Sequence, residues 1–372
     1  PMRFTITRST LLAALSIAGS VVSKNANAAL SSVLIEAREG DIRITGTDNA
    51  RTAITTVTAN VENTGSILLD AAFLAQTVKA LPEGVVVFSQ GEDFRMDVTA
   101  AKSRYKLTGA DPTTAIPAPD TRISGAHLQV LASDLRKLLD QTTFAIAPDD
   151  NRYGLNGLHL EKHDAALRAV GTDGNRLSWA QVPFTGELTI GRRMLLPRAG
   201  VEILRKLTAD LPGDTRVSIA FPERAAVASF GDTTLHMRLL EAEFPNYKEV
   251  MPKEFAREAT LSRAELLDAL RRVGIFATDG AHSVRMAFES GTLTLSSRKL
   301  DAGDAREEVA VDLKGEDITM GVNVKLLTDA ATAIPTERLV LKMGTNNLHP
   351  VLVYPAGDND TTGHIVMPVR LD

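Results

Sequence analysis

The sequence predicts an α+β fold made of three repeated domains, each with two helices packed on antiparallel sheets. One observation is an alternating strand that runs into a Thr-Asp turn, found at Ala166–Leu177 and, about 125 residues upstream, at Asp41–Arg51. The strand pattern returns about 125 residues downstream, at Gly291–Ser297. The other observation is a helix that ends at a proline and leads directly into a strand, which also occurs three times. A period this long that occurs three times indicates three copies of one domain.

The first helix of each repeat is predicted from apolar residues at helical spacing and from a polar residue that can cap its start. In the third repeat Ser262 and Glu265 stand three residues apart, which is the spacing of a capping box. In the first repeat, Ser9 or Thr10 takes the capping position. We predict these helices at Ser9–Val22, Ser124–Thr143 and Ser262–Val273.

The second helix of each repeat is bounded by the proline that follows it. A helix rarely continues into the residue before a proline, and alternation with a period of two directly afterwards is typical of a strand. We predict the helices at Asp70–Ala80, Arg198–Ala209 and Val324–Ala333. The strands that follow them are predicted at Val85–Ser89, Arg216–Ala220 and Arg338–Met343.

Two proline-rich segments, Asp111–Asp120 and Phe244–Phe255, separate the repeats. Such segments suit the connections between domains, because proline fixes φ and has no backbone N–H to donate. The chain has 372 residues, which is enough for three domains of ordinary size. We therefore predict domains at residues 1–120, 121–252 and 253–372.

The composition and the motifs argue against several classes of protein. The chain has no cysteine, which excludes a disulfide framework, a thiolate zinc site and a cysteine nucleophile. Its net charge of −5 argues against an all-basic surface, although basic residues can still gather on one face. His159 and His163 are four residues apart, but their segment is predicted as a strand and a turn and lacks the H-E-x-x-H order. Asp279, His282 and Ser283 crowd one turn, which does not suit a catalytic triad. We predict no enzyme, no cofactor and no metal site.

The N-terminal segment has two interpretations. It imitates a secretory signal, with arginines, an apolar stretch and an Ala-x-Ala pattern at Ala26–Ala28. Under that interpretation the chain is a secreted or periplasmic β-rich binding protein whose signal is cleaved. Against it, Phe4–Thr7 alternates like a strand, and the apolar residues that follow have helical spacing as in the other repeats. This pattern favours a cytoplasmic protein that keeps the segment. No run of 18 apolar residues occurs, so we expect nothing that spans a membrane.

Four motifs connect the repeat pattern with a known family. They are Arg152–Gly157 (RYGLNG), Thr172–Leu177 (TDGNRL), Phe244–Tyr247 (FPNY) and the terminal Val366–Leu371 (VMPVRL). At these motifs, and in their order along the whole chain, the sequence resembles the bacterial DNA sliding clamp, the β subunit of DNA polymerase III holoenzyme. The resemblance implies a non-catalytic processivity factor with three clamp-type domains. Two such chains would join head to tail as a ring that encircles duplex DNA and slides on it.

The resemblance also implies a partner-binding pocket between the second and third domains. Its partners would be the DNA polymerase III α subunit, the clamp loader, and other polymerases and repair proteins, all binding through short hydrophobic peptides. An apolar cleft suits the leucine and phenylalanine side chains of a peptide, and a glycine lets a backbone approach closely. Considered singly, Leu155, Leu177 and Val250 are more typical of ordinary core packing than of a binding pocket. The residues implied are Leu155, Thr172, Gly174, Asn175, Arg176, Leu177, Pro245, Val250, Val366, Met367, Pro368, Val369 and Arg370.

Basic residues on corresponding helices predict a surface that faces DNA. A ring would gather them on its bore, where contacts to phosphates are non-specific and sensitive to salt. A solvated helix face is the alternative for any one of them. The helix residues are Lys79, Arg136, Lys137, Arg198, Arg205, Lys206, Arg271, Arg272 and Lys325, and the resemblance adds the loop residues Lys24, Arg152 and Tyr153.

The resemblance implies a homodimer in which strand edges of the first and third domains pair. One edge is Ser103–Leu107 and the other is Gly274–Phe276. Main-chain pairing across two such seams fits a two-fold dimer. The residues implied at the seam are Tyr105, Leu107, Ile275 and Phe276.

Several positions depart from the residues that are usual in the family. These departures leave the architecture intact and bear on which peptides the pocket accepts. Asn175 stands in place of a histidine, Gly154 of an aromatic residue, Glu249 of a basic residue and Leu326 of a tyrosine, and Asp372 follows the usual terminal leucine.

Overall fold

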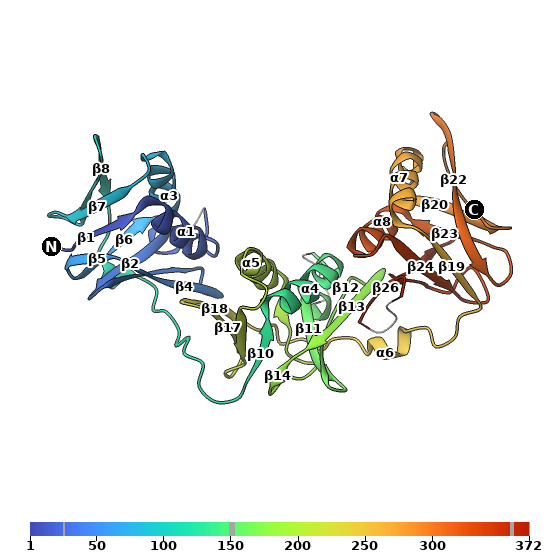
Figure 1. The fold of residues 1–372 in the computed structure, drawn as a ribbon, viewed down its shortest axis with the longest axis horizontal. Coiled ribbons are helices and arrows are strands. Elements are labelled where there is room, and N and C mark those ends of the chain that lie inside the picture. Colours follow the sequence, from blue (N-terminus) through green and yellow to red (C-terminus); the bar gives the residue numbers. More distant parts are fainter. Residues whose placement is uncertain (25–26, 149–152, 358–360, 372) are drawn as a thin grey trace. The chain divides into compact units, whose positions relative to one another are not determined.

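The computed structural model describes residues 1–24, 27–148, 153–357 and 361–371, and its internal contacts divide the chain into two compact units. The first unit consists of residues 1–133, 185–189 and 202–239, and the second of residues 134–184, 190–201 and 240–372. In each unit helices pack on antiparallel sheets (Figure 1). The predicted α+β class is therefore confirmed, whereas the three domain boundaries stay a prediction.

Several of the helices begin at a residue whose side chain caps them. Ser262 accepts a hydrogen bond from the backbone N–H of Glu265 at 3.3 Å, and Asp70 accepts one from Phe73 at 2.8 Å. Asn323 caps its helix in the same way. These contacts satisfy N–H groups that have no partner within the helix. The α-helices of the described chain are α1 (Arg8–Gly19), α2 (Ala28–Ser31), α3 (Ala71–Ala80), α4 (Ala132–Thr142), α5 (Arg198–Thr208), α6 (Tyr247–Val250), α7 (Arg263–Val273) and α8 (Val324–Ala333).

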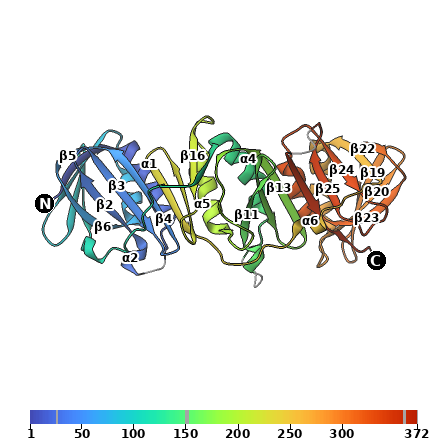
Figure 2. The ribbon, with the colours of Figure 1, turned by 90° about the horizontal axis from the view of Figure 1, so that it is seen from below.

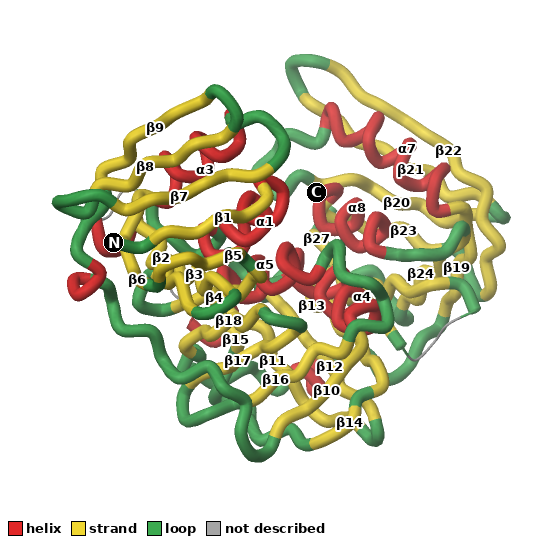
Figure 3. The backbone as a smooth tube through the Cα atoms, turned by 60° about the vertical axis from the view of Figure 1, so that its left-hand side comes forward, coloured by secondary structure: helices red, strands yellow, loops and turns green. Residues whose placement is uncertain are grey.

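The first unit contains two sheets. Figure 2 shows β2, β3 and β6 side by side in the larger one, and Figure 3 shows β7, β8 and β9 as neighbours in the smaller one. The smaller sheet has the order β5 (Asn60–Asn63), β1 (Arg3–Thr7), β7 (Val85–Gln90), β8 (Arg95–Ala100), β9 (Ser103–Thr108). The larger has the order β14 (Thr185–Gly186), β10 (His127–Leu131), β16 (Arg216–Ala220), β17 (Ala225–Phe230), β18 (Thr233–Arg238), β4 (Arg51–Thr58), β3 (Asp41–Thr47), β2 (Ser32–Arg38), β6 (Gly65–Asp70).

The second unit is organised on one long sheet. Helices α7 and α8 lie beside each other against it, and buried residues such as Leu270, Phe288 and Leu327 fill the space between them (Figure 3). The order is β15 (Leu196–Pro197), β11 (Gly157–His163), β12 (Ala166–Thr172), β13 (Arg176–Pro183), β26 (Thr362–Val366), β25 (Val351–Pro355), β24 (Arg338–Met343), β19 (Arg257–Ser262), β22 (Gly303–Lys314), β21 (Thr292–Lys299), β20 (Ser283–Glu289), β23 (Ile318–Asn323), β27 (Pro368–Val369).

The N-terminal segment is part of the core of the first unit. Leu11 and Leu15 of α1 are buried against the sheets, and Phe4 of β1 stacks on Phe88 with ring centroids 4.8 Å apart. Cleavage after Ala28 would remove β1 and α1 together and expose this core. The interpretation as a cleaved signal therefore has no support, and the strand-then-helix interpretation is confirmed.

Two predicted helix starts are wrong. The segment predicted as a helix from Ser124 contains β10, His127–Leu131, and α4 begins only at Ala132. Leu128 and Val130 alternate with more exposed residues and are buried, which is a strand pattern that can also be fitted to helical spacing over so short a stretch. In the first repeat the cap is Thr7, one turn before Thr10, whose N–H it accepts.

The remaining elements match their predictions closely. Helix α7 is capped at Ser262, as the capping box predicted, and α3, α5 and α8 end within a residue of their predicted bounds. The strands after these last three helices are β7, β16 and β24, each beginning at the predicted residue. Proline and the change of period were thus sufficient to place these boundaries.

Candidate functional site

The second unit contains a cavity of about 690 Å³ whose lining is mostly apolar. It lies where the turn between β12 and β13 meets the end of β26 and the segment around α6. The volume is within the range of sites that hold a drug-sized ligand or a few peptide side chains. The lining residues are Gly154, Leu155, Thr172, Gly174, Arg176, Leu177, Glu243, Pro245, Tyr247, Val250, Pro350, Ile365 and Met367.

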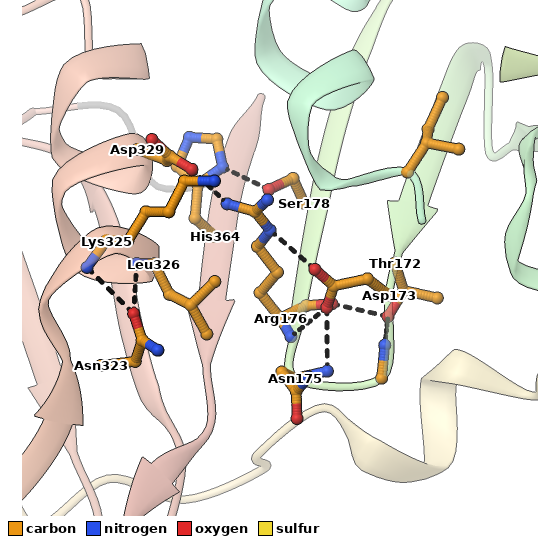
Figure 4. Close-up of polar contacts among 12 residues, drawn as sticks. Thr172, Asp173, Asn175, Arg176, Ser178, Asn323, Lys325, Leu326, Asp329 and His364 are labelled. Atoms are coloured by element: carbon orange, nitrogen blue, oxygen red, sulfur yellow. Dashed lines mark hydrogen bonds and ion pairs between the residues drawn. The ribbon is translucent and has the colours of Figure 1, made fainter. Parts of the chain in front are cut away.

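The turn from Thr172 to Arg176 forms one side of the cavity (Figure 4). Asp173 accepts hydrogen bonds from the backbone N–H groups of Asn175 and Arg176 at 2.9 and 3.0 Å, and Thr172 donates to the carbonyl of Arg176 at 2.6 Å. Gly174 has φ of +89°, a conformation that glycine adopts without strain. The side chains of the turn thus fix its backbone before any ligand arrives.

The matching turn in the first repeat has the same hydrogen bonds. Asp48 accepts from the N–H groups of Ala50 and Arg51 at 3.0 and 2.7 Å, and its carboxylate pairs with the Arg51 guanidinium. Thr47 donates to the carbonyl of Arg51 at 3.0 Å. The repeat detected in the sequence therefore extends to individual atoms of the turn.

Arg176 is held by two carboxylates. Its Nε donates to Asp173 at 3.1 Å, and its Nη1 donates to Asp329 of α8 at 2.6 Å (Figure 4). The guanidinium also lies over the ring of Phe144, 5.5 Å from the centroid. Charge-assisted hydrogen bonds of this kind are the strong ones, and the planar guanidinium can serve two acceptors at once. Arg176 thus enters the cavity wall with a fixed side chain.

The carboxylate of Glu161 holds Tyr247 in the wall of the cavity. The Tyr247 hydroxyl donates to Glu161, which also lies 3.5 Å from His159 and 3.4 Å from Lys248. Burial alone would raise the pKa of Glu161, but the hydrogen bonds from His159 and Tyr247 and the charge of Lys248 outweigh it and lower the pKa to about 2. Burial and the hydrogen bond to Glu161 raise the pKa of Tyr247 to about 12. The pair is therefore a carboxylate and a neutral phenol at neutral pH.

Strands β13 and β26 join the two sides of the cavity. They pair from Arg176↔Val366 to Ala180↔Thr362. Beside the ladder, the buried His364 meets Ser178 at 2.9 Å and Gln141 at 3.0 Å. Burial lowers the pKa of His364 to about 3, so its imidazole is neutral.

The structure brings together eight of the residues predicted for the pocket. Ordinary core packing does not account for Val250 and Met367, which stay exposed beside the cavity. The eight are Leu155, Thr172, Gly174, Arg176, Leu177, Pro245, Val250 and Met367.

The other five predicted residues lie beside the cavity wall or behind it. Val366 is buried in the core of α7, α8 and their sheet. Pro368 and Val369 form β27 and pair with β23. Arg370 is exposed, and Asn175 contributes its backbone carbonyl, which accepts a 3.0 Å hydrogen bond from the N–H of Met367.

Sequence reasoning missed five residues of the lining. Tyr247 stands in the FPNY motif and Gly154 in the RYGLNG motif, so those motifs gave a usable signal for both. A Cβ at Gly154 would lie 2.3 Å from the carbonyl oxygen of Glu243, so the backbone itself takes the space that a larger residue would need. Glu243, Pro350 and Ile365 carry no pattern that marks them, because only the fold brings them to the cavity.

The residues predicted to face DNA lie mainly on helices, and several have partners within the protein. Arg198 donates to the carbonyl of Ile146 at 2.5 Å, Arg272 pairs with Glu307 at 2.8 Å, Arg271 with Asp268 at 3.5 Å, and Lys137 donates to Thr361 at 3.0 Å. Arg136 is partly buried, while Lys24, Lys79, Arg205, Lys206 and Lys325 are exposed. Tyr153 lies in a 3₁₀ turn, and Arg152 lies outside the described residues.

The residues predicted at the dimer seam are only partly on strands. Tyr105 and Leu107 lie on β9, which is the last strand of its sheet. Beside Leu107 is a cavity of about 300 Å³, which Phe73 and Leu74 also line. Ile275 and Phe276 lie in a 3₁₀ turn after α7, so the predicted strand edge at Gly274–Phe276 is wrong. Ile275 nevertheless exposes 69% of its surface.

The remaining motifs form no reactive cluster. His159 and His163 lie on strand β11, and Asp279, His282 and Ser283 bond to one another and to nearby backbone. Across the residues the structure describes, no three His, Asp or Glu side chains are grouped closely enough to hold a metal ion. No helix in the described part of the chain has the length and apolarity needed to span a membrane.

Comparison with known proteins accounts for the whole chain. The family models for the N-terminal, central and C-terminal domains of the DNA polymerase III beta subunit match residues 2–117, 129–246 and 248–370. The chain is 30% identical to the beta sliding clamp of Pseudomonas aeruginosa, with all of both chains covered. The crystal structure of the DNA polymerase III beta subunit of Thermotoga maritima matches it with a TM-score of 0.92 at 27% identity. The P. aeruginosa clamp bound to griselimycin matches with a TM-score of 0.90 at 29% identity, and both structures cover all of this chain. The chain therefore belongs to the DNA polymerase III beta subunit family, the beta sliding clamps.

Proposed function

We propose that this chain is a DNA polymerase processivity factor that encircles duplex DNA as a homodimeric ring and tethers replication and repair proteins through the 690 Å³ cavity. The family is a non-catalytic accessory subunit of DNA polymerase III. The observation that carries the proposal is the cavity itself, because the motifs that point to the family converge on it. We place the protein in the cytoplasm, where DNA replication takes place.

The cavity suits a short peptide with apolar anchors. Leu155, Leu177 and Ile365 provide an apolar floor, and Val250 and Met367 flank it with exposed side chains. Methionine adapts to ligands of different shape, which suits a site with several partners. The P. aeruginosa clamp has been crystallised with griselimycin, so a related clamp binds an organic ligand.

The basic residues on the helices support the proposal for the bore. Lys79 on α3, Lys206 on α5 and Lys325 on α8 are exposed at equivalent helices of the three repeats. Contacts from such side chains to phosphates carry no sequence information and weaken with salt, so they permit sliding. The closed ring, and not affinity, would keep the protein on DNA.

Two exposed features support a seam between two copies. Strand β9 carries exposed Arg104 and Lys106 along the open edge of its sheet. Among the described strands, residues 303–310 of β22 pair on one side only, with β21. This segment carries exposed Asp304, Arg306 and Glu308, of which Arg306 and Glu308 pair with each other, so these three side chains together carry a net negative charge. Opposite charges and unpaired edges favour β9 of one protomer beside β22 of its partner. This pairing replaces the strand edge predicted at Gly274–Phe276, and Ile275 of the partner subunit would then enter the 300 Å³ cavity beside Leu107.

Primer extension tests the proposal. With DNA polymerase III core and clamp loader from the same organism on a primed circular single-stranded template, the chain should lengthen the products made in one binding event. Val250→Asp should shorten them by about tenfold, because a charge beside the apolar floor opposes burial of a peptide anchor.

Val85→Asp is the matched control. Val85 is as exposed as Val250, at 57% against 59%, and lies on β7. It should leave product length unchanged. Wild-type product length with Val250→Asp would contradict the assignment of the cavity.

A further inference from the structure

We propose that Asp329 is a positioning residue for the peptide pocket, which it serves by holding the guanidinium of Arg176 in the cavity wall. The inference rests on the proposed function of the cavity. Asp329 itself does not line the cavity, and no motif in the sequence marks it. Asp329 lies on α8, 153 residues from Arg176 in the sequence, and only the fold brings it to the pocket.

The two carboxylates around Arg176 have different tasks. Asp173 belongs to the same turn as Arg176, and one of its oxygens accepts from two backbone N–H groups while the other accepts from Nε, the guanidinium nitrogen nearest the backbone. Asp329 accepts from Nη1 at 2.6 Å, at the far end of the side chain (Figure 4). Asp173 therefore holds the near side of the guanidinium, at Nε, and Asp329 holds its tip, at Nη1.

The burial of this pair gives Asp329 its importance. The side chains of Arg176 and Asp329 are only 11% and 29% exposed. Water cannot fully replace a lost hydrogen-bond partner of a guanidinium this buried. Loss of the carboxylate would therefore leave Nη1 without the acceptor that it has in the folded protein. The tip of Arg176 would then move to another rotamer toward solvent, and the cavity wall formed by its stem and the turn would change shape.

Asp329 also connects the two sides of the pocket. Arg176 is on β13, whereas α8 lies in the C-terminal segment that supplies Ile365 and Met367 to the lining. The ladder between β13 and β26 holds the backbones together from Arg176↔Val366 onward, but it fixes no side chain of the wall. The ion pair of Arg176 with Asp329 adds that side-chain restraint at the end of the ladder nearest the cavity.

Peptide affinity measured by fluorescence polarisation tests the inference. The probe is a fluorescein-labelled short peptide with one leucine and one phenylalanine, and the full chain is used at low temperature after circular dichroism has shown that each variant is folded. Asp329→Asn should weaken binding about tenfold, as expected for loss of one charge-assisted hydrogen bond. Asp329→Glu keeps the charge and should restore affinity to within about threefold of the unsubstituted chain.

Glu258→Gln is the matched control. It removes one negative charge from an ion pair of the same unit, Glu258 with Lys314 at 3.3 Å, but not from the pocket. Glu258→Gln should leave peptide affinity unchanged. If the loss of one negative charge anywhere in the unit changed affinity, Glu258→Gln and Asp329→Asn would change it alike. Arg176→Lys supplies a second test that does not alter α8, because one ammonium cannot span Asp173 and Asp329 as a guanidinium does. It should lower affinity about as much as Asp329→Asn.

Three outcomes would overturn the inference. They are unchanged affinity in Asp329→Asn, an equal loss in Asp329→Glu and Asp329→Asn, and wild-type affinity in Arg176→Lys. Absence of binding by the unsubstituted chain would overturn the pocket itself, and so is distinct from a loss confined to the variants.

Discussion

At the scale of the residue, the buried imidazole of His364 shows how one side chain fastens two strands. Gln141 donates through its Nε2 to the carbonyl of Ala333 at 2.6 Å, so its Oε1 faces His364 as an acceptor. His364 must then donate from Nε2 and accept at Nδ1 from the hydroxyl of Ser178. In this neutral tautomer each ring nitrogen of His364 has a hydrogen-bond partner. A protonated imidazole would carry its charge away from water.

This network predicts a dependence of stability on pH. In the unfolded chain the imidazole binds a proton below its ordinary pKa of 6.5, but in the folded chain only near pH 3. Protonation thus favours the unfolded state, and the free energy of unfolding should fall as pH drops from about 6.5 toward 3. The limiting slope for this one group is about 1.4 kcal/mol per pH unit. Urea unfolding at several pH values measures it.

The His364→Gln variant isolates the contribution of this residue. His236, whose pKa burial also lowers, contributes in the same direction, so the difference between the two proteins is the relevant quantity. Glu161 contributes only at lower pH, as its carboxylate is protonated between about 4.5 and 2. Between pH 4.5 and 6.5 the variant should show the shallower slope. Equal slopes would contradict the neutral, buried state of His364.

At the scale of the element, the C-terminal segment is attached to the fold on both sides of the cavity. Val366 is in the core, the N–H of Met367 donates to Asn175, and Pro368 and Val369 pair with β23. Within this segment Val366 therefore belongs to the core, Met367 lines the cavity, and Pro368 and Val369 hold the following residues on β23.

Deletion of residues 367–372 should abolish peptide binding while the remaining chain stays folded. The deletion spares Val366 and removes Met367 from the lining together with the short strand β27. Fluorescence polarisation with the leucine- and phenylalanine-containing peptide measures the loss, and circular dichroism checks the fold. Deletion of Asp372 alone is the control and should bind as the full chain does. Unchanged affinity after the longer deletion would show that Met367 is not part of the site.

Elements with an explicit boundary signal could be predicted from the sequence. The capping box placed α7, and a proline followed by alternation placed β7, β16 and β24. Segment 124–143 failed because His127–Leu131 is too short for its period of two to be distinguished from helical spacing.

The candidate site was predictable to the extent that it lies in motifs. The turn Thr172–Arg176 and the terminal Met367 were identified because their residue types are specific. Pro350, Ile365 and Asp329 were not, since each reaches the pocket through pairing or packing over long separations. Val366 is buried in the core and does not line the cavity. Its apolar character fits either position, so the sequence alone could not distinguish them.

At the scale of the whole molecule, the proposed ring requires that the three-domain chain close with a second copy. The three family models match residues 2–117, 129–246 and 248–370 in order, so each third of the chain is a domain of the clamp family. The open edge of β9, the cavity beside Leu107 and the exposed Ile275 are the features that two copies would use. Ile275→Asp should therefore prevent closure without disturbing either core, because the side chain it replaces is exposed.

The most direct measurement is retention of the protein on circular DNA. The chain, loaded by the clamp loader onto nicked circular duplex DNA, is separated from free protein by gel filtration at moderate salt, before and after the DNA is cut once. A threaded ring should stay on the circle for many minutes and slide off the linear product, and Ile275→Asp should not be retained on either. Equal retention on circular and linear DNA, or none on the circle, would contradict the account of a closed ring around the double helix.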